Sequence, residues 1–285
     1  IKPGRDDKIL TAWNGLMISG FAKGYRVTNN KHYLEIAENT IEFIESRVTR
    51  DNGRLFRTFK NGISRLNAYL DDYAFYVNAL LDVFELDSNP IYLKRATKYT
   101  DFMLQHFWDP VDSTLYFTSD DHEQLIVRTK SLYDLAVPSG NSVAASNLLR
   151  LYYLTQKNDY LEKAEQIMKA GATSAAENPF GFGQLLSAIY LHVKKPVEIT
   201  VRTTNDIGEG YQMARWLNKQ FIPNAITVII ENQSQLRQLQ EYPFFKGTIP
   251  ARPSQTDYAV ICRNFTCSMP VDSLTGLQEQ IKSIK

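Results

Sequence analysis

Acidic and polar residues gather in three short clusters, and each cluster comes just before a run of apolar residues. The first two clusters contain Asp6, Asp7, Asp71 and Asp72, and the third contains Ser139. Cleavage of a glycosidic bond requires a carboxylic acid that protonates the leaving oxygen and a second carboxylate as base or nucleophile. Burial and like-charge proximity would raise the pKa of one carboxyl group and separate the two roles. We therefore take the four aspartates as candidate acid and base residues, with Asp7 and Asp72 first.

The neighbours of these aspartates could bind a sugar. Trp13 and Tyr73 have aromatic faces for stacking, and Asn14, Ser139 and Asn141 offer amide and hydroxyl groups. A structural interpretation competes with this one, because Asp and Ser are favoured at helix N-caps, where acidic groups also suit the helix dipole. The recurrence of a polar cluster at the same place in successive repeats favours the functional interpretation.

A repeat of helix pairs must position these clusters. The pattern Tyr-Leu-x-x-Ala occurs at Tyr33, Tyr92 and Tyr160, each time after a polar turn. Apolar residues then follow at steps of three and four, which is one stripe of an α-helix, so we expect outer, half-exposed helices. A more apolar helix, expected to be buried on most sides, precedes each of them: 10–27, 72–86 and 141–154.

Inner and outer helices that alternate around an axis form an α/α toroid or an α-solenoid. The repeat spacing is 59 residues (33 to 92) and then 68 residues (92 to 160). This exceeds the roughly 33 to 47 residues of common solenoid repeats and favours the toroid. A further helix, expected over 182–192, begins a fourth unit. Because all inner helices would run in the same direction, we expect their N-termini and the three clusters to meet at one mouth.

Strand-like stretches connect the helix pairs. Residues 54–59 lead into Asn61-Gly62, a strong signal for a two-residue hairpin. Residues 114–118 are the counterpart in the next unit, and we expect their return strand at 124–128.

The pattern changes after residue 192. Short apolar strands alternate with helices, which is typical of buried parallel strands. We therefore predict a mainly α chain, with part of an α/α toroid over 1–195 and a small C-terminal α/β segment over 196–285. The expected strands are 197–201, 225–230 and 258–262, and the expected helices are 211–221, 233–241 and 274–284.

Composition and charge argue against several classes of partner. The 285 residues carry 32 Lys and Arg against 31 Asp and Glu, so we expect no nucleic-acid partner and no attraction to an anionic membrane. No apolar run approaches the roughly 18 residues of a membrane-spanning helix. The histidines have no metal-ligand spacing and are expected away from the mouth, so we expect no metal and no other cofactor. They are His32, His106, His122 and His192.

Two smaller motifs fit no strong functional pattern. Cys262 and Cys267 form neither a Cys-x-x-Cys redox motif nor a zinc set, so we expect buried structural thiols. The lack of a disulfide framework favours a cytoplasmic location. Gly208 and Gly210 follow a strand in the manner of a phosphate loop, but the third glycine is missing. Nucleotide binding there is a minor alternative.

Four ordered motifs carry a resemblance to a known family. They are RDDKILTAWNGLM from residue 5, LDDYA from residue 70, PSGNS from residue 138 and CRNFTC from residue 262. Over essentially the whole chain they resemble the C-terminal half of the YyaL-type proteins, the DUF255 or spermatogenesis-associated thioredoxin-domain proteins. The resemblance implies a six-hairpin-glycosidase-like toroid with a thioredoxin-like domain before it. That domain and the first hairpins would then lie upstream of Ile1, which is not a methionine.

The resemblance fixes no reaction. The family's toroid is similar to sugar-active enzymes, including N-acylglucosamine 2-epimerases and unsaturated glucuronyl hydrolases. The epimerases use histidines, so aspartate-based processing of a sugar ligand fits this chain better than isomerisation. The alternative is a non-catalytic scaffold or ligand-binding module that serves the upstream thioredoxin-like domain. A deep mouth with Asp7 and Asp72 roughly 5–10 Å apart would favour hydrolysis.

Overall fold

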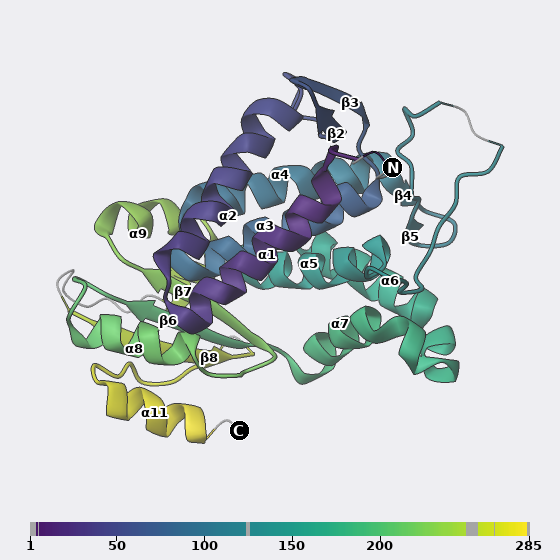
Figure 1. Ribbon diagram of the computed structural model, residues 1–285. Coiled ribbons are helices and arrows are strands. Elements are labelled where there is room, and N and C mark those ends of the chain that lie inside the picture. The colour runs from purple at the N-terminus through teal and green to yellow at the C-terminus, as the bar shows by residue number, and fades with distance from the viewer. Residues whose placement is uncertain (1–3, 5, 124–125, 249–255, 265, 284–285) are drawn as a thin grey trace.

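The computed structural model describes the chain except for residues 1–3, 5, 124–125, 249–255, 265 and 284–285. Long helices form the larger part of the molecule, and a small sheet lies beside them (Figure 1). None of the described helices combines the length and the apolar character needed to cross a membrane. The helices of the larger part are α1 (Thr11–Thr28), α2 (Lys31–Phe43), α3 (Leu70–Asp87), α4 (Pro90–Phe107), α5 (Gly140–Thr155), α6 (Asn158–Glu177) and α7 (Gly183–Lys194).

These helices alternate between an inner and an outer layer. The inner helix α3 packs against α1, α4 and α5, and α5 packs in turn against α6 and α7. Almost every face of α3 and α5 is buried, whereas α2 buries little more than the stripe containing Ala37 and Ile41. A π-helical turn, η1 (Ile44–Val48), extends α2, and a 3-10 turn, η2 (Pro179–Phe182), precedes α7. The arrangement is part of an α/α toroid, as the sequence predicts.

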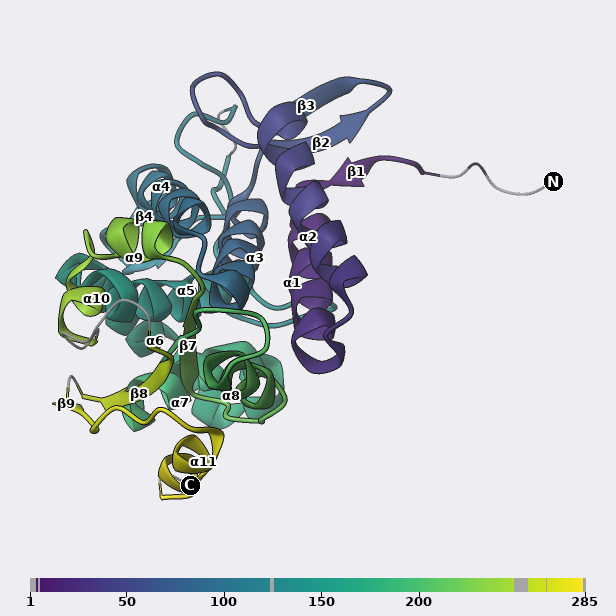
Figure 2. The same ribbon diagram turned by 90° about the vertical axis from the view of Figure 1, so that its left-hand side faces the viewer.

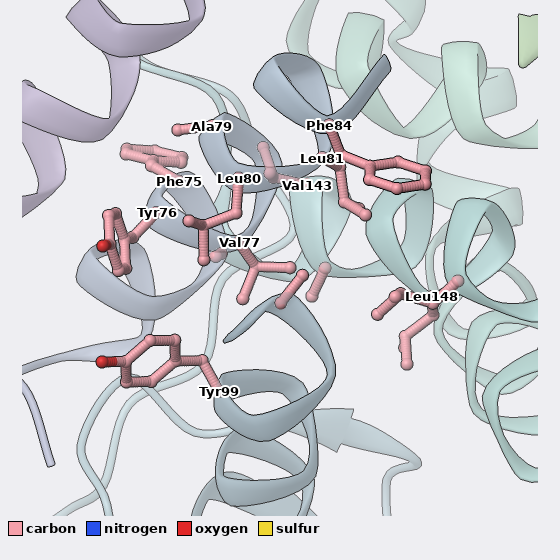
Figure 3. Close-up of a cluster of buried hydrophobic side chains, with 14 of the residues drawn as sticks. Phe75, Tyr76, Val77, Ala79, Leu80, Leu81, Phe84, Tyr99, Val143 and Leu148 are labelled. Atoms are coloured by element: carbon pink, nitrogen blue, oxygen red, sulfur yellow. The ribbon is translucent and has the colours of Figure 1, made fainter. Parts of the chain in front are cut away.

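The core between the inner helices consists of closely packed apolar side chains. Figure 3 shows residues of α3, α4 and α5 in this core, among them Leu80, Tyr99 and Leu148, which are fully buried. Gly15 allows α1 to approach α3 closely, because a Cβ atom there would lie 2.8 Å from the main-chain carbon of Phe75. A glycine in the middle of α1 is therefore a packing requirement.

The first connecting hairpin is confirmed. Strands β1 (Ile9–Leu10), β2 (Phe56–Lys60) and β3 (Ile63–Asn67) form an antiparallel sheet with β2 in the centre. Asn61 and Gly62 form the turn, with φ of 52° and 79°, as a two-residue hairpin of this kind requires.

The second predicted hairpin is wrong. β5 (Thr114–Leu115) pairs with β4 (Trp108–Asp109), the segment before it. Residues 124–125 of the expected return strand lie outside the described residues, and 126–128 are not a strand. The Asn141 side chain accepts a hydrogen bond from the Leu115 N–H (2.7 Å) and donates one to its carbonyl (2.9 Å). The Asn141 side chain thus occupies the strand edge at Leu115, and the returning segment reaches this stretch only further on, where the Phe117 N–H donates to the Thr129 carbonyl at 2.8 Å.

The C-terminal sheet is mixed. Its strands are β6 (Val197–Arg202), β7 (Ala225–Ile230), β8 (Tyr258–Arg263) and β9 (Thr266–Cys267), in the order β7-β6-β8-β9. β6 and β7 are parallel, but β8 runs antiparallel to β6, so the prediction of three parallel strands is wrong. A parallel crossover needs a helix that packs back onto the sheet. Between β7 and β8 lie α9 (Gln233–Leu239), which contacts β7 and α4, and α10 (Pro243–Thr248), which contacts α5.

Both faces of this sheet are covered. One face packs against α8 (Glu209–Asn218) and α11 (Leu274–Lys282) in a hydrophobic cluster of its own. The other face contributes Ile226, Val228 and Ile230 to the core of the helical part. The sheet therefore lies between the long helices and the pair α8 and α11 (Figures 1 and 2). Since the helical and α/β segments share a core, their division near residue 195 remains a prediction.

Candidate functional site

Side-chain carboxylates join the N-terminal ends of α1, α3 and α5. Asp72, in the first turn of α3, accepts a hydrogen bond from the main-chain N–H of Ala12 in α1 at 2.8 Å. Asp71 lies against the start of α5, where a Cβ atom on Gly140 would come within 2.5 Å of its Oδ1. A glycine at that position lets the carboxylate approach the helix end.

A third carboxylate joins α5 to α7. Asp134 Oδ1 accepts from the N–H of Ser139, and Asp134 Oδ2 accepts from the N–H of Gln184, both at 2.8 Å. The N-termini of all four inner helices therefore meet through Asp72, Asp71 and Asp134. The prediction that the helix starts gather is confirmed for these described N-termini, whereas the cluster of Asp6 and Asp7 does not reach the described lining of the mouth.

A cavity of about 270 Å³ opens at this mouth between α3 and α5. Its lining includes three of the residues proposed from the sequence, Asp71, Ser139 and Asn141, together with the ring of Tyr133 and the side chain of Leu135. An apolar wall with a few polar groups is typical of a small-molecule site.

Asp71 supplies the ionisable group of this cavity. Burial raises its pKa, while the charge of Arg57 and the N–H of Gly140 act in the opposite direction. Arg57 is held beside it with its guanidinium 4.3 Å from the ring centre of Tyr69. A half-buried carboxyl group with a raised pKa, open to a cavity, suits a general acid.

Asp72 has different surroundings. It is 1% exposed, and its second oxygen accepts from the main-chain N–H of Tyr69 at 2.8 Å. Burial raises its pKa to about 7, opposed by these hydrogen bonds and by Arg57, which lies 3.7 Å away. Both oxygens therefore hold main-chain groups, and Asp72 is absent from the described lining of the cavity. Its contacts are those of a helix cap.

Asp6 and Asp7 lie on the exposed segment before β1. Asp6 forms an ion pair with Lys8 at 3.3 Å, and Asp7 forms one with Lys60. Their neighbour Arg5 lies outside the described residues. The structure thus places these two aspartates on the surface and not in the described lining of the cavity.

The proposed sugar-binding residues separate into two groups. Trp13 is 62% exposed on α1, and Asn14 beside it donates to the carbonyl of Leu10 at 2.8 Å. Tyr73 is buried, and its hydroxyl accepts from the N–H of Leu55 at 3.1 Å. These three residues are absent from the described cavity lining, whereas Ser139 and Asn141 belong to it.

Ser139 and Asn141 shape the cavity through the loop that covers it. Ser139 is the N-cap of α5, and its hydroxyl donates to the carbonyl of Ser131 at 2.8 Å. The Asn141 amide also donates to that carbonyl, at 3.1 Å. Both side chains therefore fix the segment that carries Tyr133.

The sequence interpretation missed Tyr133, Asp134, Arg57 and one histidine. The ring of His122 stacks on Tyr69, the N-cap of α3, with ring centres 5.1 Å apart. The expectation that the histidines lie away from the mouth is therefore wrong for His122, because its turn folds back onto the start of α3. Only Asp134 had a local signal, an acidic residue shortly before the Pro-Ser-Gly turn of α5. The others are brought together by tertiary contacts.

A buried charge network lies further along the inner helices. Arg150 of α5 contacts Glu85 at 2.7 Å and Asp82 at 2.9 Å, both in α3. Arg26 of α1 contacts Glu85 at 3.2 Å, and the Asn78 amide oxygen accepts from Arg150 at 3.3 Å. The network connects α1, α3 and α5 through groups of opposite charge.

The main-chain N–H groups of Gly208 and Gly210 are already bonded by side chains of the same chain. The N–H of Gly210 donates to Asp257 Oδ2 at 2.8 Å, and that of Gly208 donates to the Asn205 side chain at 2.6 Å. A Cβ atom on Gly210 would collide with the main chain at Arg202. Close packing accounts for Gly210, and a carboxylate already takes the N–H that a phosphate would bind.

The expectation of two buried thiols is wrong. Cys262 and Cys267 form a disulfide. They are direct partners across β8 and β9, with Cα atoms 3.9 Å apart. A spacing of five residues is enough for a tight hairpin that places its first and last residues opposite each other.

Relatives of the chain are known by sequence. No family model matches it. An uncharacterized protein of Caenorhabditis elegans is 31% identical over 97% of this chain and 38% of the relative. Human spermatogenesis-associated protein 20 is 28% identical over 95% of this chain and 35% of the relative. The chain therefore spans little more than a third of the length of these relatives.

One solved structure resembles most of the chain. It is a GH76 α-mannanase of Bacteroides thetaiotaomicron, with a TM-score of 0.53 and 15% identity, covering 86% of this chain and 71% of that one. A likeness at this identity concerns the fold alone. The chain is thus similar in sequence to spermatogenesis-associated protein 20 and similar in fold to an α/α-toroid glycoside hydrolase.

Proposed function

We propose that the cavity at the N-termini of α3 and α5 is a saccharide site and that Asp71 acts there as general acid and base. The observation that carries the proposal is the position of Asp71, a half-buried carboxyl group with a raised pKa on the wall of this cavity. General acid catalysis requires a group of this kind within reach of the reacting oxygen.

The walls suit a sugar ring. Sugars present both apolar C–H faces and hydroxyl groups, and the cavity lining combines Tyr133 and Leu135 with Asp71 and Ser139. Its volume of about 270 Å³ is just below the range of drug-sized sites, so it would hold about one ring. The fold likeness to an α-mannanase makes α-mannosides the first substrates to test.

Asp134 positions the end of α5 beside Asp71, but it is absent from the described cavity lining and both of its oxygens accept main-chain N–H groups, so we give it no catalytic role. Asp134 accepts from the N–H of Ser139, and Asp71 interacts with the N–H of the next residue, Gly140. Hydrogen bonds to consecutive N–H groups keep two carboxyl groups within about 9 Å of each other. In this proposal Asp71 takes the role that the sequence interpretation gave to Asp72.

We further propose the membership that the motifs suggest. In that view the chain is the C-terminal part of a YyaL-type or DUF255 cytoplasmic protein, with a helical region over 1–195, an α/β region over 196–285 and a thioredoxin-like domain upstream as its partner. The support is the resemblance of the four motifs and the partial coverage of the relatives.

A non-catalytic scaffold or ligand-binding module for that upstream domain is the second candidate. The observation that favours it is that Asp72 and Asn141 use their polar atoms to hold the main chain. Saccharide binding without turnover would support this candidate.

Saccharide binding to the full-length protein tests the proposed site. Titration calorimetry with α-manno-oligosaccharides should detect binding, and Tyr133→Ala should weaken it at least tenfold. Tyr190→Ala is the matched control, because Tyr190 is equally exposed, at 45% against 44%, but lies outside this cavity. Equal losses in both variants would contradict the assignment of the site.

A further inference from the structure

The disulfide connects the exposed edge strand of the C-terminal sheet to a buried residue on the neighbouring strand. Cys267 is exposed on β9, the edge strand, whereas Cys262 is 1% exposed on β8. We therefore take Cys267 as the residue that an incoming group attacks from solvent, because Cys262 is buried.

A buried carboxyl group lies in the same row. Glu198 on β6 is the register partner of Cys262, on the side opposite Cys267. Directly opposed residues of antiparallel strands project from the same face, with Cβ atoms about 4.5 to 5.5 Å apart. Glu198, Cys262 and Cys267 therefore follow one another across one face of the sheet.

Glu198 is buried with one carboxyl oxygen left without a hydrogen bond among the described residues. Its side chain is 2% exposed, and its Oε1 has no hydrogen-bond partner in the described part of the chain. Burial raises its pKa to about 7. A carboxyl group that is buried without a hydrogen bond lowers the free energy of unfolding. We therefore look for a functional role for Glu198.

Few charged groups face Glu198. Tyr153 of α5 is a titratable group that interacts with it: burial raises the pKa of Tyr153, and the charges of Tyr152 and Glu198 add to that effect. Arg202 and Tyr258 share the same face but are paired with each other at the far end of the strands, four residues away. The pKa of Glu198 is therefore set mainly by burial.

We propose that Cys262, Cys267 and Glu198 form a redox site that exchanges two electrons with an external dithiol, and that Glu198 transfers the proton to and from the Cys262 sulfur. This site is separate from the saccharide cavity and does not depend on the proposed function.

The reaction is a thiol–disulfide exchange. A thiolate of the external dithiol attacks the exposed Cys267 sulfur, the Cys262–Cys267 bond breaks, and its electron pair leaves on Cys262. The Glu198 carboxylic acid gives its proton to that thiolate. The second thiolate of the reductant then displaces Cys267, which takes a proton from water. The dithiol leaves as a disulfide, two protein thiols are formed, and Glu198 recovers a proton from solvent.

Reduction of the folded protein by dithiothreitol tests the proposal. Acid quenching, alkylation and mass spectrometry count the thiols over time, and the rate constants are divided by the thiolate fraction of dithiothreitol at each pH. Two thiols should appear without unfolding, and oxidised dithiothreitol should restore the disulfide. The corrected rate should fall as pH rises through about 7, because the proton donor is lost.

Glu198→Gln should slow reduction at pH 6.5 at least tenfold and remove this inflection. Glu198→Asp, which retains a proton, should keep the inflection, and Glu279→Gln, a change at an exposed glutamate of α11, should behave as the unmodified chain. Circular dichroism checks that each variant is folded. Thiols that appear only on unfolding, or an unchanged rate and pH profile in Glu198→Gln, would overturn the proposal and leave the disulfide as a structural clamp.

Discussion

The carboxylate of Asp72 holds the main-chain N–H of Ala12 at 2.8 Å, across a separation of 60 residues. Its other oxygen holds the N–H of Tyr69, at the start of its own helix. One buried side chain therefore fixes where α3 begins and where α1 lies against it. The mouth depends on this contact, because Asp71 occupies the preceding position in the chain.

Replacing Asp72 should destabilise the fold more than replacing its neighbour. Asp72→Asn places an amide N–H₂ against a main-chain donor, so we expect a loss of about 1–3 kcal/mol in the free energy of unfolding. Asp71→Asn is the control and should cost less than about 1 kcal/mol, since Asp71 is half-buried and its amide would still accept one hydrogen bond. Urea unfolding curves measure both values. Equal stabilities would show that Asp72 does not hold the helices together.

Two glycines of α1 should respond in opposite ways to alanine. Gly15→Ala places a methyl group against the main chain of Phe75 and Tyr76, so we expect it to destabilise the protein by about 1–3 kcal/mol despite the better helix propensity of alanine. Gly20→Ala meets no atom within 4 Å and should stabilise by up to about 1 kcal/mol. Thermal unfolding gives the sign of each change, and a stabilising Gly15→Ala would refute the described packing of α1 on α3.

The helical part of the fold was largely predictable, because its helices carry clear periodic patterns. The second hairpin could not be predicted, because the edge of its strand at Leu115 is taken by the side chain of Asn141, 26 residues away. The direction of β8 was equally hidden, because an apolar run such as residues 258–262 reads the same for a strand that runs either way. At the site, the sequence indicated the helix ends that meet. It could not distinguish Asp71 from Asp72, because adjacent residues at a helix start point in different directions. One faces a cavity and the other faces the main chain.

Breaking the buried charge network should be costly. Arg150→Ala would leave Glu85 and Asp82 without their main counter-charge, so we expect a loss of about 3–5 kcal/mol. Arg95→Ala is the matched control, because its ion pairs to Glu42 and Glu45 are longer, at 3.8 and 3.5 Å. That change should cost about 1 kcal/mol or less. Similar costs in urea unfolding would mean that the network contributes little.

Glu198 should make stability depend on pH. Its folded-state pKa of about 7 lies above the ordinary 4.5, so the folded state binds the proton more tightly than the unfolded state. The contribution of protonated Glu198 to the free energy of unfolding is fully present below pH 4.5. It is lost as pH rises through 7, which lowers the free energy of unfolding by about 3 kcal/mol. Asp72 and Asp87, whose pKa values burial also raises to about 7, act in the same direction, so the comparison with Glu198→Gln isolates one group. A pH dependence identical in the two proteins would contradict the proton assignment.

The most direct test of the saccharide site is the turnover of α-mannosides, and of a wider glycoside panel, by full-length protein with and without Asp71→Asn. Loss of the acid should reduce kcat at least 100-fold, whereas Asp6→Asn, a change at an exposed aspartate paired with Lys8, should leave it unchanged. Turnover that persists in Asp71→Asn, or the absence of both binding and turnover across the panel, would contradict the account.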